Sequence, residues 1–321
     1  MKKIIILLIV FTVIGLPLHA DKYAGEFLNI GVGVKARALG NAFTAIADDP
    51  TATYWNPAGI FWQNNLSFNL MHSEEFSGNL KYDALSGVYP LDENKKFGFL
   101  ITRIGISGIP LTELADPDDS LSVHNPPHVY KYVNDADYVI YLSFSSLAYT
   151  KLSFGVTSKL IYRSIGDIKA SGIGIDGGLL YKPVENINVG LTLRDIIGTT
   201  IWWKDGQTEV ISPNMLVGFA WRFTFPIINV RSTLSLQSDI KFENRKESAQ
   251  FNFGSTSLDF HAGLLFKIAP FLSVAGGMNQ ENFTAGLLIS YRNYSLQYAF
   301  ENNPDLDLDN IHRLSVDYFL P

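Results

Sequence analysis

Residues 151–163 read Lys-Leu-Ser-Phe-Gly-Val-Thr-Ser-Lys-Leu-Ile-Tyr-Arg, a run in which two kinds of residue alternate. One set of positions, starting at Leu152, holds Leu, Phe, Val, Ser, Leu and Tyr, whereas the other holds Lys, Ser, Gly, Thr, Lys, Ile and Arg. Successive side chains of a β-strand point to opposite faces, so this period of two predicts a strand with one apolar face. The same alternation recurs at residues 258–268 and 293–300, and it predicts an all-β protein.

Fourteen such strands can be placed from residue 66 onward, using the alternation and the turn residues between the runs. They cover residues 66–72, 80–89, 96–105, 136–145, 151–164, 172–182, 187–194, 213–223, 230–240, 258–268, 271–278, 283–291, 293–300 and 311–319.

The connections between these strands differ in length according to their order. Those after odd-numbered strands include residues 106–135, 195–212 and 241–257, whereas those after even-numbered strands are as short as residues 269–270 or residue 292 alone. Outer-membrane barrels have long loops at one end and short turns at the other. A soluble β-sandwich is the alternative, but nothing in that architecture sorts loops by order. The sequence therefore predicts a 14-stranded antiparallel transmembrane β-barrel in contact with the lipid of a Gram-negative-type outer membrane.

The composition excludes several classes of function. The 321 residues are 47% hydrophobic and 13% aromatic, include no cysteine, and carry a formal net charge of −6. A chain without cysteine has no disulfide framework, no thiolate metal site and no cysteine nucleophile. Because a basic surplus is absent, no nucleic acid is expected as a partner.

The first twenty residues have the pattern of a secretory signal peptide. Lys2 and Lys3 precede the apolar residues 4–16, and Ala20 is a small residue suited to signal peptidase. An uncleaved anchor helix is the alternative, but the apolar stretch is short of the roughly 20 residues that span a bilayer. We expect three parts, which are a signal peptide (1–20), an N-terminal hatch or plug (21–62) and an outer-membrane barrel (63–321).

Residues 21–62 are the part of the mature chain that does not alternate. Leu39, Phe43 and Ile46 recur at helical spacing, which predicts a short helix over residues 38–47. Fourteen strands enclose more space than the roughly eight that side chains alone can fill. This compact segment is therefore expected to fold back into the bore as a plug.

A turn follows that helix in the sequence. Asn56, Pro57, Ala58 and Gly59 have Asn, Pro and Gly at the positions that a type I turn favours. An Asn side chain can bond to the backbone two residues on, and Pro presets its own φ. We expect this motif to fix the path of the hatch.

The N-terminal segment also carries a family resemblance. Residues 23–49 read YAGEFLNIGVGVKARALGNAFTAIADD and residues 53–59 read TYWNPAG. These stretches resemble the amino-terminal signature of the PorV/PorQ family, whose members are similar in fold to FadL, the fatty-acid channel of Gram-negative outer membranes. The resemblance implies a fourteen-stranded barrel with an amino-terminal hatch. It also implies a role in the type IX secretion system, escorting cargo or binding the translocon and surface-attachment proteins, or else passage of hydrophobic molecules as in FadL.

Charged residues on the polar strand faces are expected to point into the bore, because a Lys or Arg facing lipid at the midplane would cost roughly 2–4 kcal/mol. The candidate lumen charges are Lys151, Lys159, Arg163, Arg222, Arg292 and Arg313. Their possible partners are Asp176, Asp239, Asp259 and Asp317. A ladder of ion pairs that stiffens the barrel and a clamp for a ligand carboxylate are both open interpretations.

No motif points to catalysis, a metal or a cofactor. The glycine patterns that begin at Gly31 and Gly172 lack the strand, turn and helix context of a dinucleotide site. The alternating acids from Asp305 to Asp309 lack the glycine and glutamate of a calcium loop. A serine-hydrolase elbow is also missing, so an enzyme is not expected.

We therefore predict a non-enzymatic accessory or cargo-shuttle barrel of a secretion system. The alternative is a channel for fatty acids or other hydrophobic molecules, with such a ligand in the lumen, and a soluble periplasmic β-protein is a third reading. Aromatic residues in the long connections, Trp202, Trp203 and Phe251, suggest contacts with a secretion translocon or with surface-attachment proteins.

Overall fold

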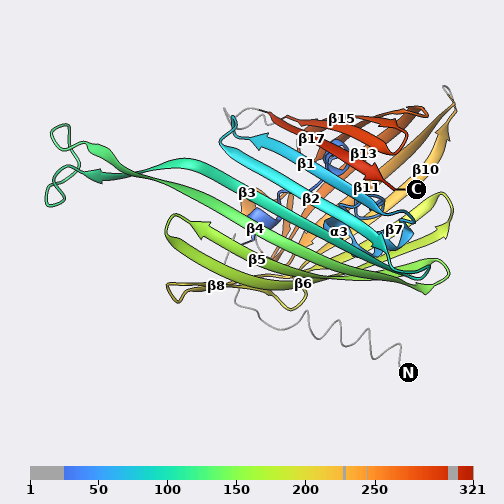
Figure 1. Ribbon diagram of the computed structural model, residues 1–321, viewed down its shortest axis with the longest axis horizontal. Coiled ribbons are helices and arrows are strands. Elements are labelled where there is room, and N and C mark those ends of the chain that lie inside the picture. The colour runs from blue at the N-terminus through green and yellow to red at the C-terminus, as the bar shows by residue number, and fades with distance from the viewer. Residues whose placement is uncertain (1–24, 227–228, 244, 303–309, 321) are drawn as a thin grey trace.

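A computed structural model describes residues 25–226, 229–243, 245–302 and 310–320 (Figure 1). The predicted signal peptide at residues 1–20 lies outside these ranges, as do the acids Asp305, Asp307 and Asp309. Among the described residues, none of the helices has the length and apolar character that would let it span a bilayer.

The wall is a closed antiparallel barrel of fourteen strands, as predicted, because the first strand pairs with the last through Ser67 to Phe319. The wall strands are β1 (Ser67–Glu75), β2 (Leu80–Pro90), β3 (Lys95–Leu114), β4 (Pro127–Tyr149), β5 (Leu152–Ile165), β6 (Ile168–Val184), β7 (Ile187–Arg194), β10 (Asn214–Phe225), β11 (Val230–Lys241), β13 (Thr256–Ala269), β14 (Leu272–Asn279), β15 (Asn282–Tyr291), β16 (Tyr294–Glu301) and β17 (Ile311–Phe319). Each predicted strand corresponds to one of these.

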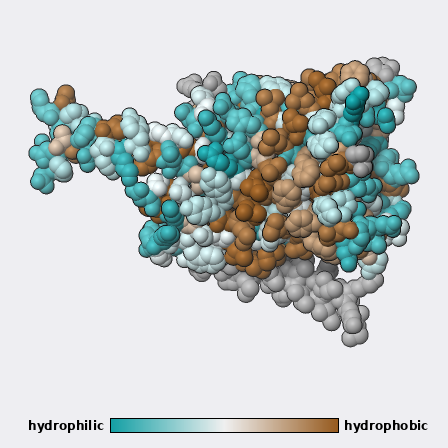
Figure 2. Space-filling model, in the orientation of Figure 1, coloured by the Kyte–Doolittle hydropathy of each residue, from teal (hydrophilic) through white to brown (hydrophobic). Residues whose placement is uncertain are grey.

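The alternating residues lie as their chemistry requires for a barrel in a membrane. On β5, Ser153, Thr157 and Lys159 are buried toward the bore, whereas Leu160 and Tyr162 on the opposite face are exposed. Exposed apolar side chains come from strands throughout the wall, and on the face seen in Figure 2 they form a band with more hydrophilic residues toward both ends. Such an outward apolar band between polar rims is the arrangement of outer-membrane barrels.

The long connections contain more strand than predicted. Strands β3 and β4 continue to Leu114 and from Pro127, so most of the expected loop at 106–135 is a two-stranded ribbon that projects far from the barrel (Figure 1). The ribbon was missed because both of its faces meet solvent and a bulge lies between Ile106 and Ile109, so no apolar alternation marks it.

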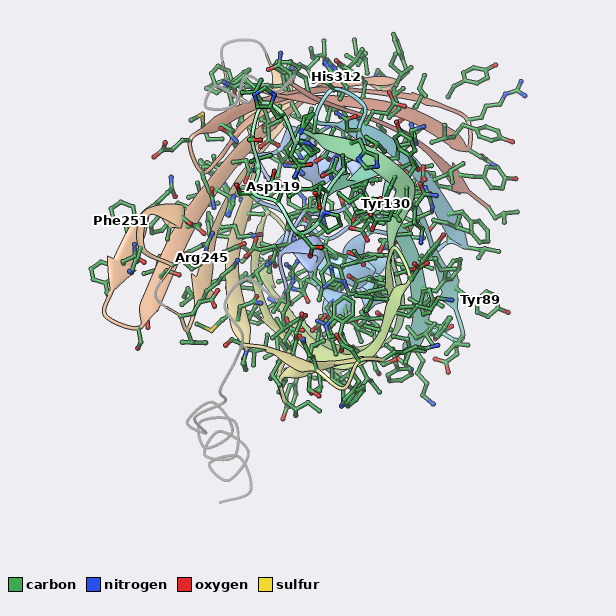
Figure 3. All side chains as sticks on the ribbon, turned by 90° about the vertical axis from the view of Figure 1, so that its left-hand side faces the viewer. Tyr89, Asp119, Tyr130, Arg245, Phe251 and His312 are labelled. Carbon is green, nitrogen blue, oxygen red and sulfur yellow. The ribbon has the colours of Figure 1, made fainter. Side chains whose placement is uncertain are left out.

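Two other predicted loops also form short strands. β8 (Thr199–Trp203) pairs with β6 and with β9 (Thr208–Ile211), and β12 (Phe251–Phe253) follows η3 (Lys246–Ser248) and pairs with β13. Figure 3 views the barrel from the ribbon end, and Phe251 points away from the bore at its rim. We call this the long-loop end and the opposite one the short-turn end.

The inner segment, residues 25–63, lies within the barrel (Figure 1). It contains η1 (Glu26–Leu28), α2 (Val34–Ala38), α3 (Ala52–Trp55) and η2 (Pro57–Trp62). The helix predicted over residues 38–47 is wrong, because α2 ends where that helix would begin. Gly40 and Asn41 both have positive φ, at 62° and 65°, and this left-handed backbone ends a helix.

Candidate functional site

The inner segment touches the wall at a track of inward-facing glycines. A Cβ added to Gly155 would lie 2.4 Å from the Pro57 carbonyl carbon, and one added to Gly190 would lie 2.4 Å from the Thr44 oxygen. Further close approaches occur at Gly178, Gly218, Gly263 and Gly286. Only glycine leaves room for this approach of one backbone to another. The wall strands are therefore shaped for the segment that they enclose.

Polar side chains of the wall bond the irregular backbone of the inner segment. The Gln237 Oε1 atom accepts hydrogen bonds from the backbone amides of Phe43 and Thr44, at 3.1 and 2.9 Å. The Asn188 Nδ2 group donates to the Ala45 carbonyl at 2.9 Å. Because buried backbone groups without partners destabilise a fold, these bonds hold the segment in one position.

The tetrapeptide from Asn56 to Gly59 forms the start of η2. Asn56 Oδ1 accepts a bond from the Ala58 amide at 3.1 Å, and the Gly59 amide donates to the Asn56 carbonyl at 2.9 Å. The Asn56 Nδ2 group donates to the carbonyls of Thr44 and Leu179, both at 3.0 Å. The side chain thus joins two parts of the inner segment to strand β6.

Four of the six candidate lumen charges point into the bore. Lys159 binds Asp176 at 2.8 Å and also Asp195. The others are Arg163, which binds Asp137, Arg222, which donates to Asn188, and Arg313, which binds Glu75. The predicted acids Asp239 and Asp259 lie beside His261 and Arg245, while Asp317 accepts bonds from Asn69 and Gln297.

The other two candidates, Lys151 and Arg292, do not face the bore. Lys151 is exposed in the turn before β5, with its Nζ donating to the Pro183 carbonyl at 2.6 Å. Arg292 is exposed in the turn between β15 and β16, where its guanidinium lies over the Tyr291 ring. The prediction was wrong because both residues lie just beyond a strand end, where the alternation no longer fixes a direction.

A buried charge network at the long-loop end was missed from the sequence. Arg37 of the inner segment binds Glu301, and Arg313 binds Glu75 at 2.8 Å and the Gly31 carbonyl at 2.6 Å. Glu75 and Glu301 continue the inward alternation of β1 and β16, but the predicted strands stopped just short of both. Longer strand boundaries would have found them, whereas the partner Arg37 has no such signal.

The ion pairs of Lys159 give a test of the lumen network. The lysine and both carboxylates are almost fully buried, so Lys159→Met leaves two adjacent acids without a counterion. We expect this change to destabilise the barrel by about 3–5 kcal/mol. Unfolding by guanidinium in detergent measures the loss. The matched control Lys131→Met removes an exposed pair with Asp167 and should leave the unfolding midpoint unchanged. Equal midpoints for both variants would contradict this account.

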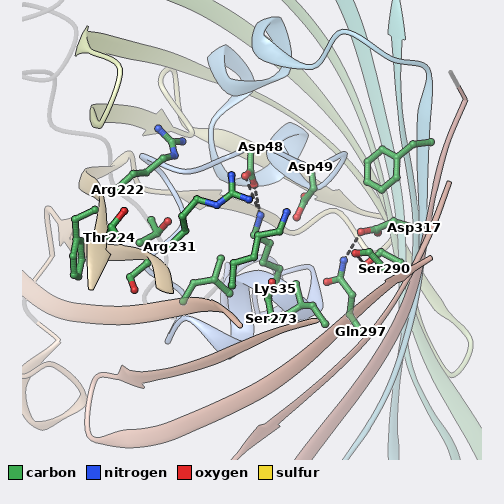
Figure 4. A pocket seen from close by; sticks show the side chains of 18 residues that line it. Lys35, Asp48, Asp49, Arg222, Thr224, Arg231, Ser273, Ser290, Gln297 and Asp317 are labelled. Atoms are coloured by element: carbon green, nitrogen blue, oxygen red, sulfur yellow. Dashed lines mark hydrogen bonds and ion pairs between the residues drawn. The ribbon is translucent and has the colours of Figure 1, made fainter. Parts of the chain in front are cut away.

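Two cavities lie on opposite sides of the inner segment and share no lining residue. The short-turn cavity, about 590 Å³, is lined by Lys35 and Asp49 of the segment and by Arg222 and Asp317 of the wall (Figure 4). Burial raises the pKa of Asp49 to about 6, although the Lys35 ammonium acts in the opposite direction. The long-loop cavity, about 310 Å³, is described below.

Comparisons with known proteins identify relatives only at the level of structure. No protein-family model matches the chain, and no curated protein matches it by sequence. The toluene transporter TbuX of Ralstonia pickettii aligns with a TM-score of 0.62 and 12% identity, over 91% of this chain and 99% of that one. The toluene transporter TodX of Pseudomonas putida gives 0.60 and 13%, over 90% and 98%. A FadL homologue of Pseudomonas aeruginosa gives 0.53 and 10%, over 89% and 98%.

The chain therefore has the fold of the FadL-like barrels. With its closed fourteen-stranded wall and outward apolar band, it is a multi-pass β-barrel of the Gram-negative outer membrane. The finer resemblance to PorV/PorQ receives no support from these structures.

Proposed function

We propose that the protein is a channel that passes small molecules with a hydrophobic body across the outer membrane, and that residues 21–62 are its hatch. The observation that carries this proposal is the position of the inner segment, which lies in the bore between two cavities and contributes residues to both. A solute crossing the bore must displace it. The names of the similar structures, two of them toluene transporters, favour this function over a secretion role.

Uptake by cells tests the proposed function. Gram-negative host cells that lack a channel of this type are given labelled toluene or labelled oleate, with and without the barrel in their outer membrane. The account expects faster uptake of at least one solute when the barrel is present. A correctly inserted barrel that accelerates neither solute would contradict it.

A second candidate, the accessory role in secretion, has one observation in its favour. The β3–β4 ribbon stands free of the barrel, with Leu121, Tyr130 and Tyr132 exposed. A two-stranded ribbon alone is marginally stable in water, so a protein partner would stabilise it.

Removal of the ribbon separates the two candidates. Residues 109–133 are replaced by an Asn-Gly turn between Gly108 and Asn134, which already contact each other at 3.0 Å. If the barrel is a channel, we expect uptake to persist and the set of co-purifying proteins to stay the same. Loss of a co-purifying protein with no measurable uptake in either form would favour the secretion role.

A further inference from the structure

One cation in the lining of the long-loop cavity has no carboxylate of the described residues within 4 Å. Its lining includes the acids Glu26, Glu75, Asp239 and Asp259. Each of these acids has a basic side chain within 4 Å. Glu26 has Lys241 at 3.7 Å, Glu75 has Arg313 at 2.8 Å, Asp239 has His261 at 3.6 Å, and Asp259 has Arg245. Arg37, also in the lining, is bound to Glu301. Arg194 is the lining cation for which no carboxylate of the described residues lies within this distance.

The contacts of the Arg194 guanidinium are with aromatic rings, because the carboxylates nearest to it lie more than 4 Å away. Its guanidinium lies 4.2 Å from the Tyr54 ring centre and 5.5 Å from that of Trp55. Its two hydrogen bonds are long, at 3.4 Å to the Tyr54 hydroxyl and 3.3 Å to the Tyr54 carbonyl. The residue is only 7% exposed, so a guanidinium with five N–H donors is buried with most of its bonding capacity unused.

Unpartnered polar atoms gather around the same cavity. The Asn41 Oδ1 atom is buried without a hydrogen-bond partner among the described residues, and so is the Nε atom of both Arg37 and Arg245. All three residues line this cavity. Buried polar groups without partners are costly, so their concentration in one place indicates a site for a polar group.

We propose that the long-loop cavity binds a small aromatic carboxylate, with its carboxylate on Arg194 and its ring against Tyr54 and Trp55. A planar guanidinium matches a carboxylate through two parallel hydrogen bonds. The volume of about 310 Å³ is at the small end of ligand sites, and the charged lining does not suit a long acyl chain. This inference rests on the proposed function, since it specifies the solute that the channel takes.

Calorimetry on the full-length barrel in detergent tests the site, with benzoate as the probe. Benzamide has nearly the same shape without the charge, so it should bind about ten- to a hundredfold more weakly. The substitution Arg194→Gln should weaken benzoate binding by the same factor, and Arg194→Lys should restore part of it. The control Arg103→Gln removes a partly exposed arginine that lines neither cavity and pairs with Asp83, and this variant should bind benzoate like the unchanged protein.

Stability separates a binding role of Arg194 from a structural one. A buried arginine with no carboxylate within 4 Å is costly to the fold, so Arg194→Gln should leave the unfolding midpoint unchanged or raise it. Benzoate binding that is absent from the unchanged protein, or equal in Arg194→Gln, would overturn the proposed site. If labelled toluene is still taken up in that case, only the site is wrong. Benzoate binding without accelerated uptake of any solute, benzoate included, would instead overturn the proposed function.

Discussion

Valine in place of Gly190 should open the bore. The added Cβ would lie 2.4 Å from the Thr44 oxygen and 2.9 Å from the Ala45 Cα, so the inner segment cannot stay in its place. Strand pairing needs no change, because valine favours the strand conformation. We expect conductance in planar bilayers to rise roughly tenfold or more, since fourteen strands enclose more space than side chains fill.

A second glycine on the wall gives the matched control for this variant. At Gly276 on β14, the nearest atom to an added Cβ is 3.7 Å away, so Gly276→Val should leave the conductance unchanged. Both barrels should still resist unheated detergent in electrophoresis. Equal conductance of the two variants would show that the glycine track does not hold the segment.

The double substitution Asn56→Ala and Pro57→Ala should also raise the conductance, but through loosening rather than displacement. It removes three hydrogen bonds of the Asn56 side chain, two of them to the carbonyls of Thr44 and Leu179. Each bond contributes about 0.5–1.5 kcal/mol, and the Thr44 carbonyl left behind is buried. We therefore expect brief openings in single-channel records instead of a permanently open bore.

The control for this variant is Asn79→Ala with Pro110→Ala, two exposed positions in the hairpins of the long-loop end. This barrel should remain closed. If the Asn56 and Pro57 variant also shows no channel openings, or if its barrel fails to form, the turn does not fix the hatch.

Alternation was enough to place the wall, because one face of each strand meets lipid and the other meets a polar bore. On β5 the predicted and observed inward residues agree from Ser153 to Ile161. The signal ends where the membrane ends, so the ribbon beyond Ile106 could not be recognised. The helix predicted in the inner segment was wrong for another reason. Its path at Gly40 follows from contacts with the backbone of Ala262 and Met278, which no local pattern contains.

The residues of the candidate site that lie on wall strands were also predictable from the sequence, but the role of Arg194 was not. Lys159 and Arg313 follow from their inward positions, and Glu75 and Glu301 would have followed from slightly longer strands. Arg194 is the last residue of a predicted strand, yet its significance depends on what surrounds it. The aromatic rings beside it come from Tyr54 and Trp55, more than a hundred residues earlier, and the lack of a counterion appears only in three dimensions.

The central claim is that solutes cross this barrel only when the inner segment moves, and a cross-link tests it most directly. Ala58 and Ser153 are replaced by cysteines, because the native Ser153 hydroxyl lies 2.8 Å from the Ala58 carbonyl and the chain has no other cysteine. The thiols are oxidised to a disulfide, and uptake of labelled toluene is measured before and after. The account predicts that uptake falls to the level of cells without the barrel and that reduction of the disulfide restores it. Uptake that continues unchanged with the segment fixed to the wall would contradict the account.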